Sequence, residues 1–155
     1  MIEKGIGGAN TKTGIIFEDK VDLEKALGNK NLGIILKKHS FVKYMKEELG
    51  RDARQILSSI LLPDNVLITE NIIHVIEVKF QKVSGSVDEK LQTCLFKKRQ
   101  YEKLAEGTGK KVVYTYILND WFKNDKYKDV LEFIESVGCN FFFNEIPIDF
   151  LVNGE

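Results

Sequence analysis

The sequence has few of the residues that build disulfide frameworks and zinc sites. Its 155 residues include only two cysteines and two histidines, and Cys94 and Cys139 stand alone, without Cys-x-x-Cys or Cys/His spacing. Such spacing marks structural zinc sites and disulfide-rich scaffolds, so neither is indicated. We therefore expect a protein with reduced thiols in the cytoplasm.

Long apolar runs are also missing. No stretch approaches the ~18–20 apolar residues needed to cross a bilayer, and residues 1–5 lack the basic-then-apolar pattern of a signal peptide. Neither an internal repeat nor a low-complexity linker divides the chain, and its length suits one domain with a substantial core. We expect a single domain over residues 1–155, with no membrane partner.

An excess of charge of either sign is absent as well. Twenty-three basic residues balance twenty-three acidic ones, so the total charge does not indicate a polyanion partner. The distribution is more informative, because residues 30–46 hold five lysines and no acidic residue, and Lys97-Lys98-Arg99 forms a second basic run. Solvated helix faces explain such runs as readily as nucleic-acid contacts do.

Periodicity and capping signals predict alternating helices and strands. Helices are expected at residues 15–27, from Ser40 to Gly50, from the capping box Ser86-Val87-Asp88-Glu89 onward, and at 125–137. Strands are expected within residues 56–80, which are rich in β-branched residues around a turn at 69–71, and at 111–118 and 140–144. This order predicts an α/β fold with a central mixed β-sheet flanked by helices.

The expected strand over residues 72–81 carries an unusual polar pair. Because side chains alternate across a strand, Glu77 and Lys79 lie on one face and the apolar residues Ile72, Ile76, Val78 and Phe80 on the other. A carboxylate and an ammonium are costly to bury on a core strand without a purpose or a partner. Asp64 comes beside Glu77 if the two β segments pair through the turn between them. The alternative is a structural ion pair at a sheet edge.

Two carboxylates and a lysine at such a junction suit phosphodiester hydrolysis. Asp64 and Glu77 offer the hard oxygen ligands that Mg²⁺ prefers. The ion can acidify a bound water and neutralise charge that develops on the phosphate. Lys79 would orient or deprotonate that water, or stabilise the transition state.

Pro63-Asp64, followed thirteen residues later by Glu77-Val78-Lys79, resembles the motif of the PD-(D/E)XK nuclease superfamily, and more narrowly its type II restriction endonucleases. The resemblance spans roughly residues 7–105 and includes the run at 85–90 that leads into a long helix. It implies a restriction-endonuclease-like core. It also implies a further catalytic carboxylate from the first helix, where Glu18 matches; an ordinary surface glutamate explains Glu18 equally well.

The resemblance implies sequence-specific, Mg²⁺-dependent hydrolysis of double-stranded DNA by a homodimer in a restriction system. The lysines expected to face DNA are Lys37, Lys38, Lys43 and Lys46. A homing endonuclease or Holliday-junction resolvase on the same core, or a non-catalytic DNA-binding module, remains an alternative.

Two further residues have open roles in the sequence. His74 lies on the apolar face of its strand, which favours a core histidine over a ligand. Lys90 could contact a phosphate near the site or could simply be exposed on its helix.

Overall fold

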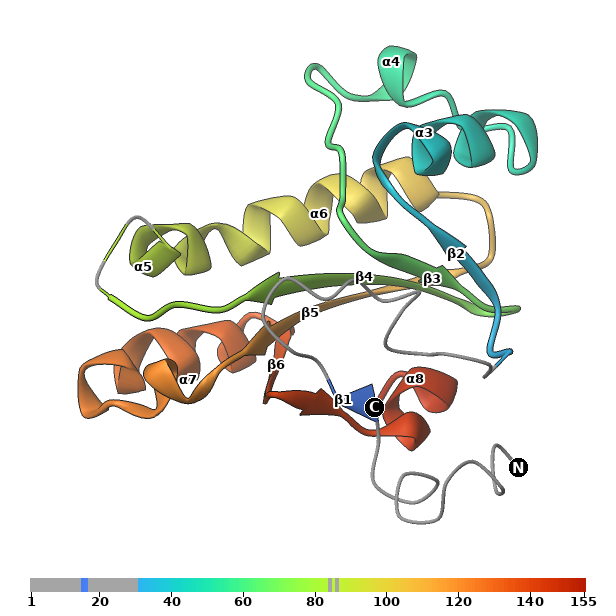
Figure 1. Cartoon of the computed structure of the whole chain (residues 1–155). Coiled ribbons are helices and arrows are strands. Elements are labelled where there is room, and N and C mark those ends of the chain that lie inside the picture. Colours follow the sequence, from blue (N-terminus) through green and yellow to red (C-terminus); the bar gives the residue numbers. More distant parts are fainter. Residues whose placement is uncertain (1–14, 17–30, 84, 86) are drawn as a thin grey trace.

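A five-stranded mixed β-sheet forms the centre of the protein. The computed structural model describes residues 15–16, 31–83, 85 and 87–155. In spatial order the strands are β2 (Ile34–Leu36), β3 (Val66–Ile68), β4 (Ile72–Lys79), β5 (Lys111–Leu118) and β6 (Asn140–Phe143). Helices flank this sheet (Figure 1), so the chain has an α/β fold and the predicted fold class is confirmed.

The sheet combines an antiparallel hairpin with parallel strands. β3 and β4 pair antiparallel with Val66 opposite Val75, and the turn between them is closed by a hydrogen bond from the Ile72 N–H to the Thr69 hydroxyl (3.2 Å). β4, β5 and β6 are parallel to one another and are joined by helical crossovers. β5 is buried along all but its first residue, as expected for a strand covered on both faces.

Two hydrophobic clusters lie on opposite faces of the sheet. The larger one joins alternate residues of β4 and β5 to helices α3 (Lys38–Glu47), α6 (Cys94–Ala105) and α7 (Lys128–Ser136). The smaller one joins the other residues of these strands to α8 (Ile148–Asn153). Figure 1 shows α6 and α8 on opposite sides of the sheet. Burial of these two apolar faces is the main force that holds the layers together.

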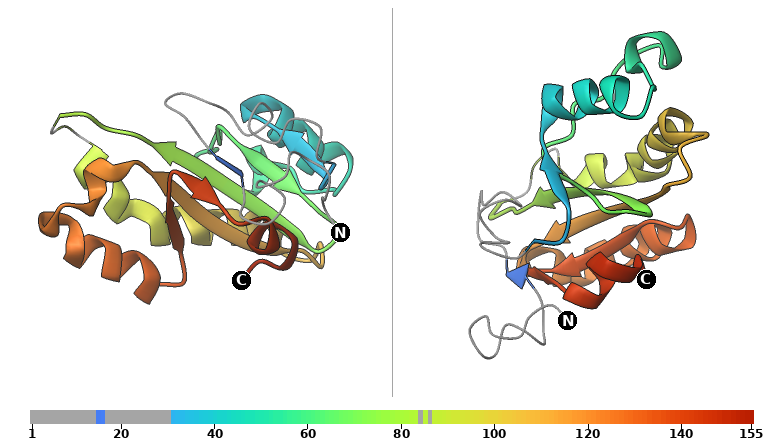
Figure 2. Two further views of the ribbon diagram at one scale, coloured as in Figure 1. Left: turned by 60° about the horizontal axis from the view of Figure 1, so that its bottom comes forward. Right: turned by 90° about the vertical axis from the view of Figure 1, so that its right-hand side faces the viewer.

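Short elements complete the described chain. They are β1 (Ile15–Ile16) and β7 (Glu145–Ile146), α4 (Ala53–Ile56), α5 (Val87–Lys90), and the 3-10 turns η1 (Leu91–Thr93), η2 (Asp120–Lys123) and η3 (Asp125–Tyr127). In Figures 1 and 2, α3 and α4 lie above the β2 edge of the sheet, on the side of α6. None of the helices in the described ranges is both long and apolar enough to cross a membrane.

The structure corrects three local predictions. Ile15 and Ile16 were expected to begin a helix but form β1, because β7 offers these β-branched residues an antiparallel partner; residues 17–27 of that expected helix lie outside the described part. Helix α3 begins at Lys38 and not after Ser40, whose hydroxyl instead accepts the Lys37 N–H (2.9 Å). Residues 57–65, expected to be β structure, precede the hairpin without joining the sheet.

Candidate functional site

Glu77 and Lys79 end β4 on the face that carries the larger hydrophobic cluster. Ile73 and Val75, four and two residues before Glu77, belong to that cluster, so the polar pair continues the same face beyond the core. The Lys79 ammonium lies 3.3 Å from Oε1 of Glu77, and the two side chains are only 21% and 10% exposed. The side-chain alternation expected along β4 is therefore confirmed.

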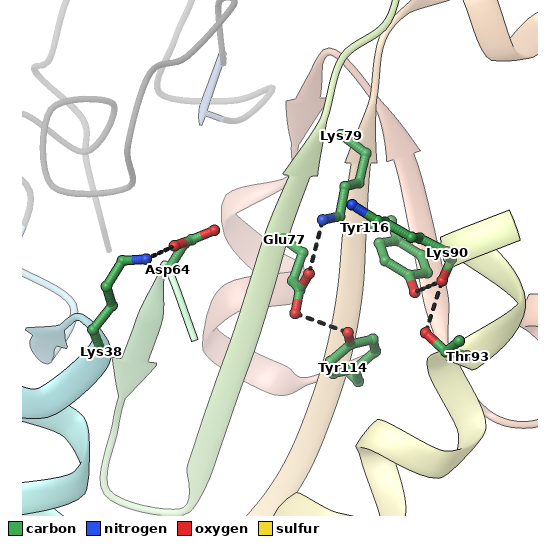
Figure 3. Close-up of polar contacts among 8 residues, drawn as sticks. All are labelled: Lys38, Asp64, Glu77, Lys79, Lys90, Thr93, Tyr114 and Tyr116. Atoms are coloured by element: carbon green, nitrogen blue, oxygen red, sulfur yellow. Dashed lines mark hydrogen bonds and ion pairs between the residues drawn. The ribbon is translucent and has the colours of Figure 1, made fainter. Parts of the chain in front are cut away.

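Tyr114 fixes the second oxygen of the Glu77 carboxylate. Its hydroxyl donates a 2.9 Å hydrogen bond to Oε2 of Glu77 from the adjacent strand β5, and the tyrosine is fully buried (Figure 3). Burial, reinforced by the negative charge of Glu77, raises the pKa of Tyr114 far above its usual range. The phenol therefore stays protonated and is always able to donate. Glu77 is thus oriented from both sides, by Tyr114 and by Lys79.

Asp64 occupies the chain position just before β3 that lies next to Glu77. Val66 pairs with Val75, and the carbonyl of Asn65 accepts a hydrogen bond from the N–H of Ile76 (2.9 Å), so the register carries Asp64 alongside the Glu77 end of β4. Its carboxylate is turned toward helix α3 (Figure 3), where the Lys38 ammonium lies 3.0 Å from Oδ1. These two side chains are 61% and 59% exposed, in contrast to the buried Glu77.

The start of α3 is fastened to the site by its backbone as well. The N–H of Lys38 donates a 2.6 Å hydrogen bond to the carbonyl of Pro63, the residue before Asp64. Lys43 and Lys46 are exposed further along the helix. Four lysines were expected to face DNA. Lys38 contacts Asp64, an expected catalytic residue, and Lys37 is the N-cap of α3. Lys43 and Lys46 lie on the outer surface of the helix.

The donor set is small. Glu18, the third expected carboxylate, lies outside the described residues. Within the described ranges no group of three or more His, Cys, Asp or Glu side chains is placed to hold a metal ion. The chemistry of two carboxylates would suit Mg²⁺, because this ion commonly keeps several waters and takes only one or two carboxylates together with substrate phosphates.

A second polar network holds α5 against the end of β4. Gln81, which follows β4, donates to Oδ1 of Asp88 (3.1 Å), and the Tyr127 hydroxyl donates to the same oxygen (2.9 Å). Trp121 in turn donates to the Tyr127 hydroxyl (2.7 Å). Trp121 and Tyr127 therefore belong to the structural support of the site, and Tyr127 is buried together with its neighbour Phe122.

Sequence reasoning missed Tyr114 and its neighbour Tyr116. The signal was present, because two tyrosines alternate within the apolar run at residues 112–118 and therefore share one face of the strand. Buried tyrosine hydroxyls usually find a hydrogen-bond partner. What the sequence does not contain is the parallel register that places Tyr116 opposite Glu77.

His74 lies on the other face of β4 and takes no part in the site. Its Nε2 lies 2.8 Å from the carbonyl of Leu151 in α8, and its ring packs against Phe150. Burial lowers the pKa of His74 to about 4, more than the Leu151 hydrogen bond raises it, and the Lys111 charge lowers it further. The expectation of a core histidine is confirmed. Nδ1 has no partner among the described residues.

Comparison with known proteins adds no assignment: neither a protein-family model, nor a curated protein, nor a solved structure matches this chain.

Proposed function

We propose that this protein is a Mg²⁺-dependent endonuclease that hydrolyses double-stranded DNA at a specific sequence, as type II restriction endonucleases of the PD-(D/E)XK superfamily do. The observation that carries the proposal is the pair formed by the buried Glu77 and the partly buried Lys79 at the end of a central strand, with Asp64 on the neighbouring segment. An apolar pair would pack at this position at least as well as an acid and a base, so packing alone does not explain why Glu77 and Lys79 are there.

In the proposed site Asp64 and Glu77 would hold Mg²⁺, and the Tyr114 hydroxyl keeps the Glu77 carboxylate in one orientation. The ion would supply an acidified water and positive charge that offsets the charge developing on the phosphate. Lys79, held beside Glu77, donates hydrogen bonds to the phosphate oxygen on which negative charge develops. The ion pair with Glu77 (3.3 Å) holds the Lys79 ammonium at the end of β4, so the side chain does not have to move before it acts.

Lys38 forms an exposed ion pair with Asp64 (3.0 Å). An exposed ion pair of this kind contributes only ~0–1 kcal/mol, because water screens it and two flexible side chains must be ordered. A divalent cation, with two positive charges close to the carboxylate, competes effectively with one such ammonium. Released from Asp64, Lys38 could turn to a DNA phosphate, which is consistent with its expected role in DNA binding.

The biological setting follows from the same proposal. One site per chain cuts one strand, so cleavage of both strands calls for a homodimer whose two-fold axis matches a near-palindromic target. We infer that such an enzyme acts in the cytoplasm, where a restriction system meets incoming DNA. A homing endonuclease or junction resolvase would use the same residues on different substrates, and a non-catalytic module would bind DNA without cutting it.

The test is cleavage of a mixed-sequence plasmid in Mg²⁺ by the wild type and by Asp64→Asn and Glu77→Gln. Discrete fragments from the wild type, lost in both variants, are expected. Glu106→Gln removes the same charge at an exposed position beyond α6 and should cut normally. A wild type that binds the plasmid but never cuts it would establish the non-catalytic module. Preference for a four-way junction over the plasmid would establish the resolvase.

Lys79→Arg provides a second test at the same site. Arginine keeps the positive charge, but its planar, delocalised guanidinium cannot place a compact ammonium 3.3 Å from Glu77. We expect cleavage to fall by ~10²-fold or more while Mg²⁺ and DNA binding persist. Activity retained in Lys79→Arg would restrict the residue to an electrostatic role.

A further inference from the structure

A second lysine approaches the site from helix α5. Figure 3 shows the Lys90 side chain extending from the end of α5 toward Lys79 and Glu77, with its ammonium directed into the space beside them. Lys90 is exposed and makes no ion pair within the described part of the chain. Its approach is unusual, because one ammonium already lies against the Glu77 carboxylate and like charges repel.

The backbone of Lys90 is anchored to the strand that neighbours Glu77. Its carbonyl accepts hydrogen bonds from the Tyr116 hydroxyl (3.3 Å) and from the Thr93 hydroxyl (2.8 Å). Tyr116 stands directly opposite Glu77 in the parallel β4–β5 register. The Gln81–Asp88 hydrogen bond (3.1 Å) holds the same short helix from the β4 side. Lys90 is therefore held over the site by both central strands.

The local charge favours an anion. Two ammonium groups, on Lys79 and Lys90, approach the single carboxylate of Glu77, whereas Lys38 is paired with Asp64 and the Asp88 carboxylate accepts hydrogen bonds from Gln81 and Tyr127. One oxygen of Glu77 already accepts the hydrogen bond of Tyr114. Glu77 alone therefore cannot neutralise both lysines, and an incoming phosphate group would complete the balance.

We propose that Lys90 and Lys79 form a phosphate-binding pair that holds the non-bridging oxygens of the phosphodiester being cleaved. The inference deepens the proposed nuclease function and rests on it for the identity of the phosphate. Lys79 binds from the strand side and Lys90 from the helix side. Lys90 is thus a second substrate-contacting lysine, outside the Asp…Glu-x-Lys motif, positioned by Tyr116, Thr93 and Asp88.

The first experiment measures phosphate binding without any need for cleavage. Lysine side chains are labelled by reductive ¹³C-methylation, which keeps their charge, and inorganic phosphate is titrated in while their NMR signals are followed. In the wild type the Lys79 and Lys90 signals should shift together and saturate. Lys90→Gln should weaken phosphate binding about tenfold or more, the usual effect of losing a charged hydrogen-bond donor. Lys103→Gln, an exposed change at the far end of α6, should leave it unchanged.

The second experiment measures cleavage of plasmid in Mg²⁺ by the same variants. Lys90→Gln should lower kcat by ~10²-fold, as expected when one preorganised donor to the reacting phosphate is removed, and Lys103→Gln should cut like the wild type. Circular dichroism checks that both variants are folded. Wild-type phosphate binding or wild-type cleavage by Lys90→Gln, or the lack of a saturable shift at Lys90, would overturn the inference. If Lys79 and Lys90 bind phosphate but the wild type never cuts DNA, the nuclease proposal fails and the phosphate site stands.

Discussion

Single hydrogen bonds decide how the candidate site is oriented. The Glu77 carboxylate lies between the Lys79 ammonium and the Tyr114 phenol, and burial raises the pKa of the phenol so that it stays protonated at neutral pH. A ligand held by an outer partner in this way loses little entropy when a metal ion binds. Partners of this kind commonly account for ~10–100-fold in metal affinity or activity.

Tyr114→Phe tests this positioning role. We expect Mg²⁺ affinity to fall by ~10-fold, because Glu77 loses the bond that fixes its orientation. The measurement is the Mg²⁺ dependence of plasmid cleavage, together with Mg²⁺ titration by calorimetry. Tyr116→Phe removes the hydroxyl two residues further along the same face of β5, which donates to the Lys90 carbonyl and also interacts with the Tyr114 hydroxyl, so its effect on Mg²⁺ dependence should be smaller. An equal change in Mg²⁺ dependence for both variants would argue for a merely structural effect.

His74 should make stability depend on pH. Burial lowers its pKa to about 4, below the ordinary value of 6.5, so the unfolded chain binds more protons than the folded one between these two values. The part of the free energy of unfolding that comes from this pKa difference is fully present above pH 6.5 and is lost as the pH falls toward 4. A shift of this size corresponds to about 3 kcal/mol over that window.

The measurement is urea unfolding at pH 7 and at pH 4.5. His74→Gln removes the titration while its amide can still donate to the Leu151 carbonyl, so this variant should lose less stability on acidification than the wild type. The chain's other histidine provides the matched control, because His39 is exposed and His39→Gln should follow the wild type. Parallel curves for all three proteins would contradict the assignment.

At the scale of the element, the edge strand β2 depends on a close approach of two backbones. A Cβ atom added at Gly33 would lie 2.3 Å from the carbonyl oxygen of Ile68 in β3, which is backbone and cannot move aside cheaply. Only glycine lets the chain reach the hairpin at this point, after which β2 pairs with β3 from Ile34 onward.

Gly33→Ala should therefore destabilise the fold by about 1–3 kcal/mol, the usual cost of forcing extra atoms into a packed region. Denaturant unfolding measures the loss. Gly85→Ala serves as the control, because the nearest atom to its added Cβ is a side-chain oxygen of Gln81 at an ordinary 3.8 Å. Equal stability of the two variants would show that β2 can shift to accept the methyl group.

At the scale of the whole molecule, the proposed nuclease function requires one surface to face DNA. The basic helix α3 begins beside Asp64, next to the candidate site, and presents Lys43 and Lys46 to solvent. The run at residues 97–99 lies on α6, where Lys98 is paired with Glu102 on its own helix (3.1 Å). Proximity to the site therefore favours α3 as the source of phosphate contacts.

A salt titration of DNA binding in Ca²⁺ distinguishes these surfaces. The Lys43→Gln/Lys46→Gln variant leaves Lys38 and Asp64 intact and should flatten the salt dependence by ~0.9 in slope for each DNA phosphate that the protein no longer neutralises. Specific and non-specific duplexes should weaken alike, because phosphate contacts carry no sequence information directly. Replacing Lys97, Lys98 and Arg99 should change the slope less. An unchanged slope for the α3 variant would place the DNA on another face.

The sequence by itself determined the features that depend on neighbouring residues. The period-two pattern of residues 72–81 placed Glu77 and Lys79 on one face of β4, and the apolar run at 111–118 marked β5 with the bounds that the structure has. The turn between two β-rich segments was enough to bring Asp64 beside Glu77. Alternation and hairpin pairing are local, so the hydrophobic pattern specifies them.

Only the tertiary structure decided what depends on contacts between distant segments. Tyr114 reaches Glu77 because two strands separated by a helical crossover pair in one particular register, and Lys38 reaches Asp64 because α3 folds over the start of the hairpin. Ile15 and Ile16 became a strand because β7, near the other end of the chain, offered them a partner. Local propensity yields in such places, since the free energy of a long-range partner exceeds the small differences between helix and strand preference.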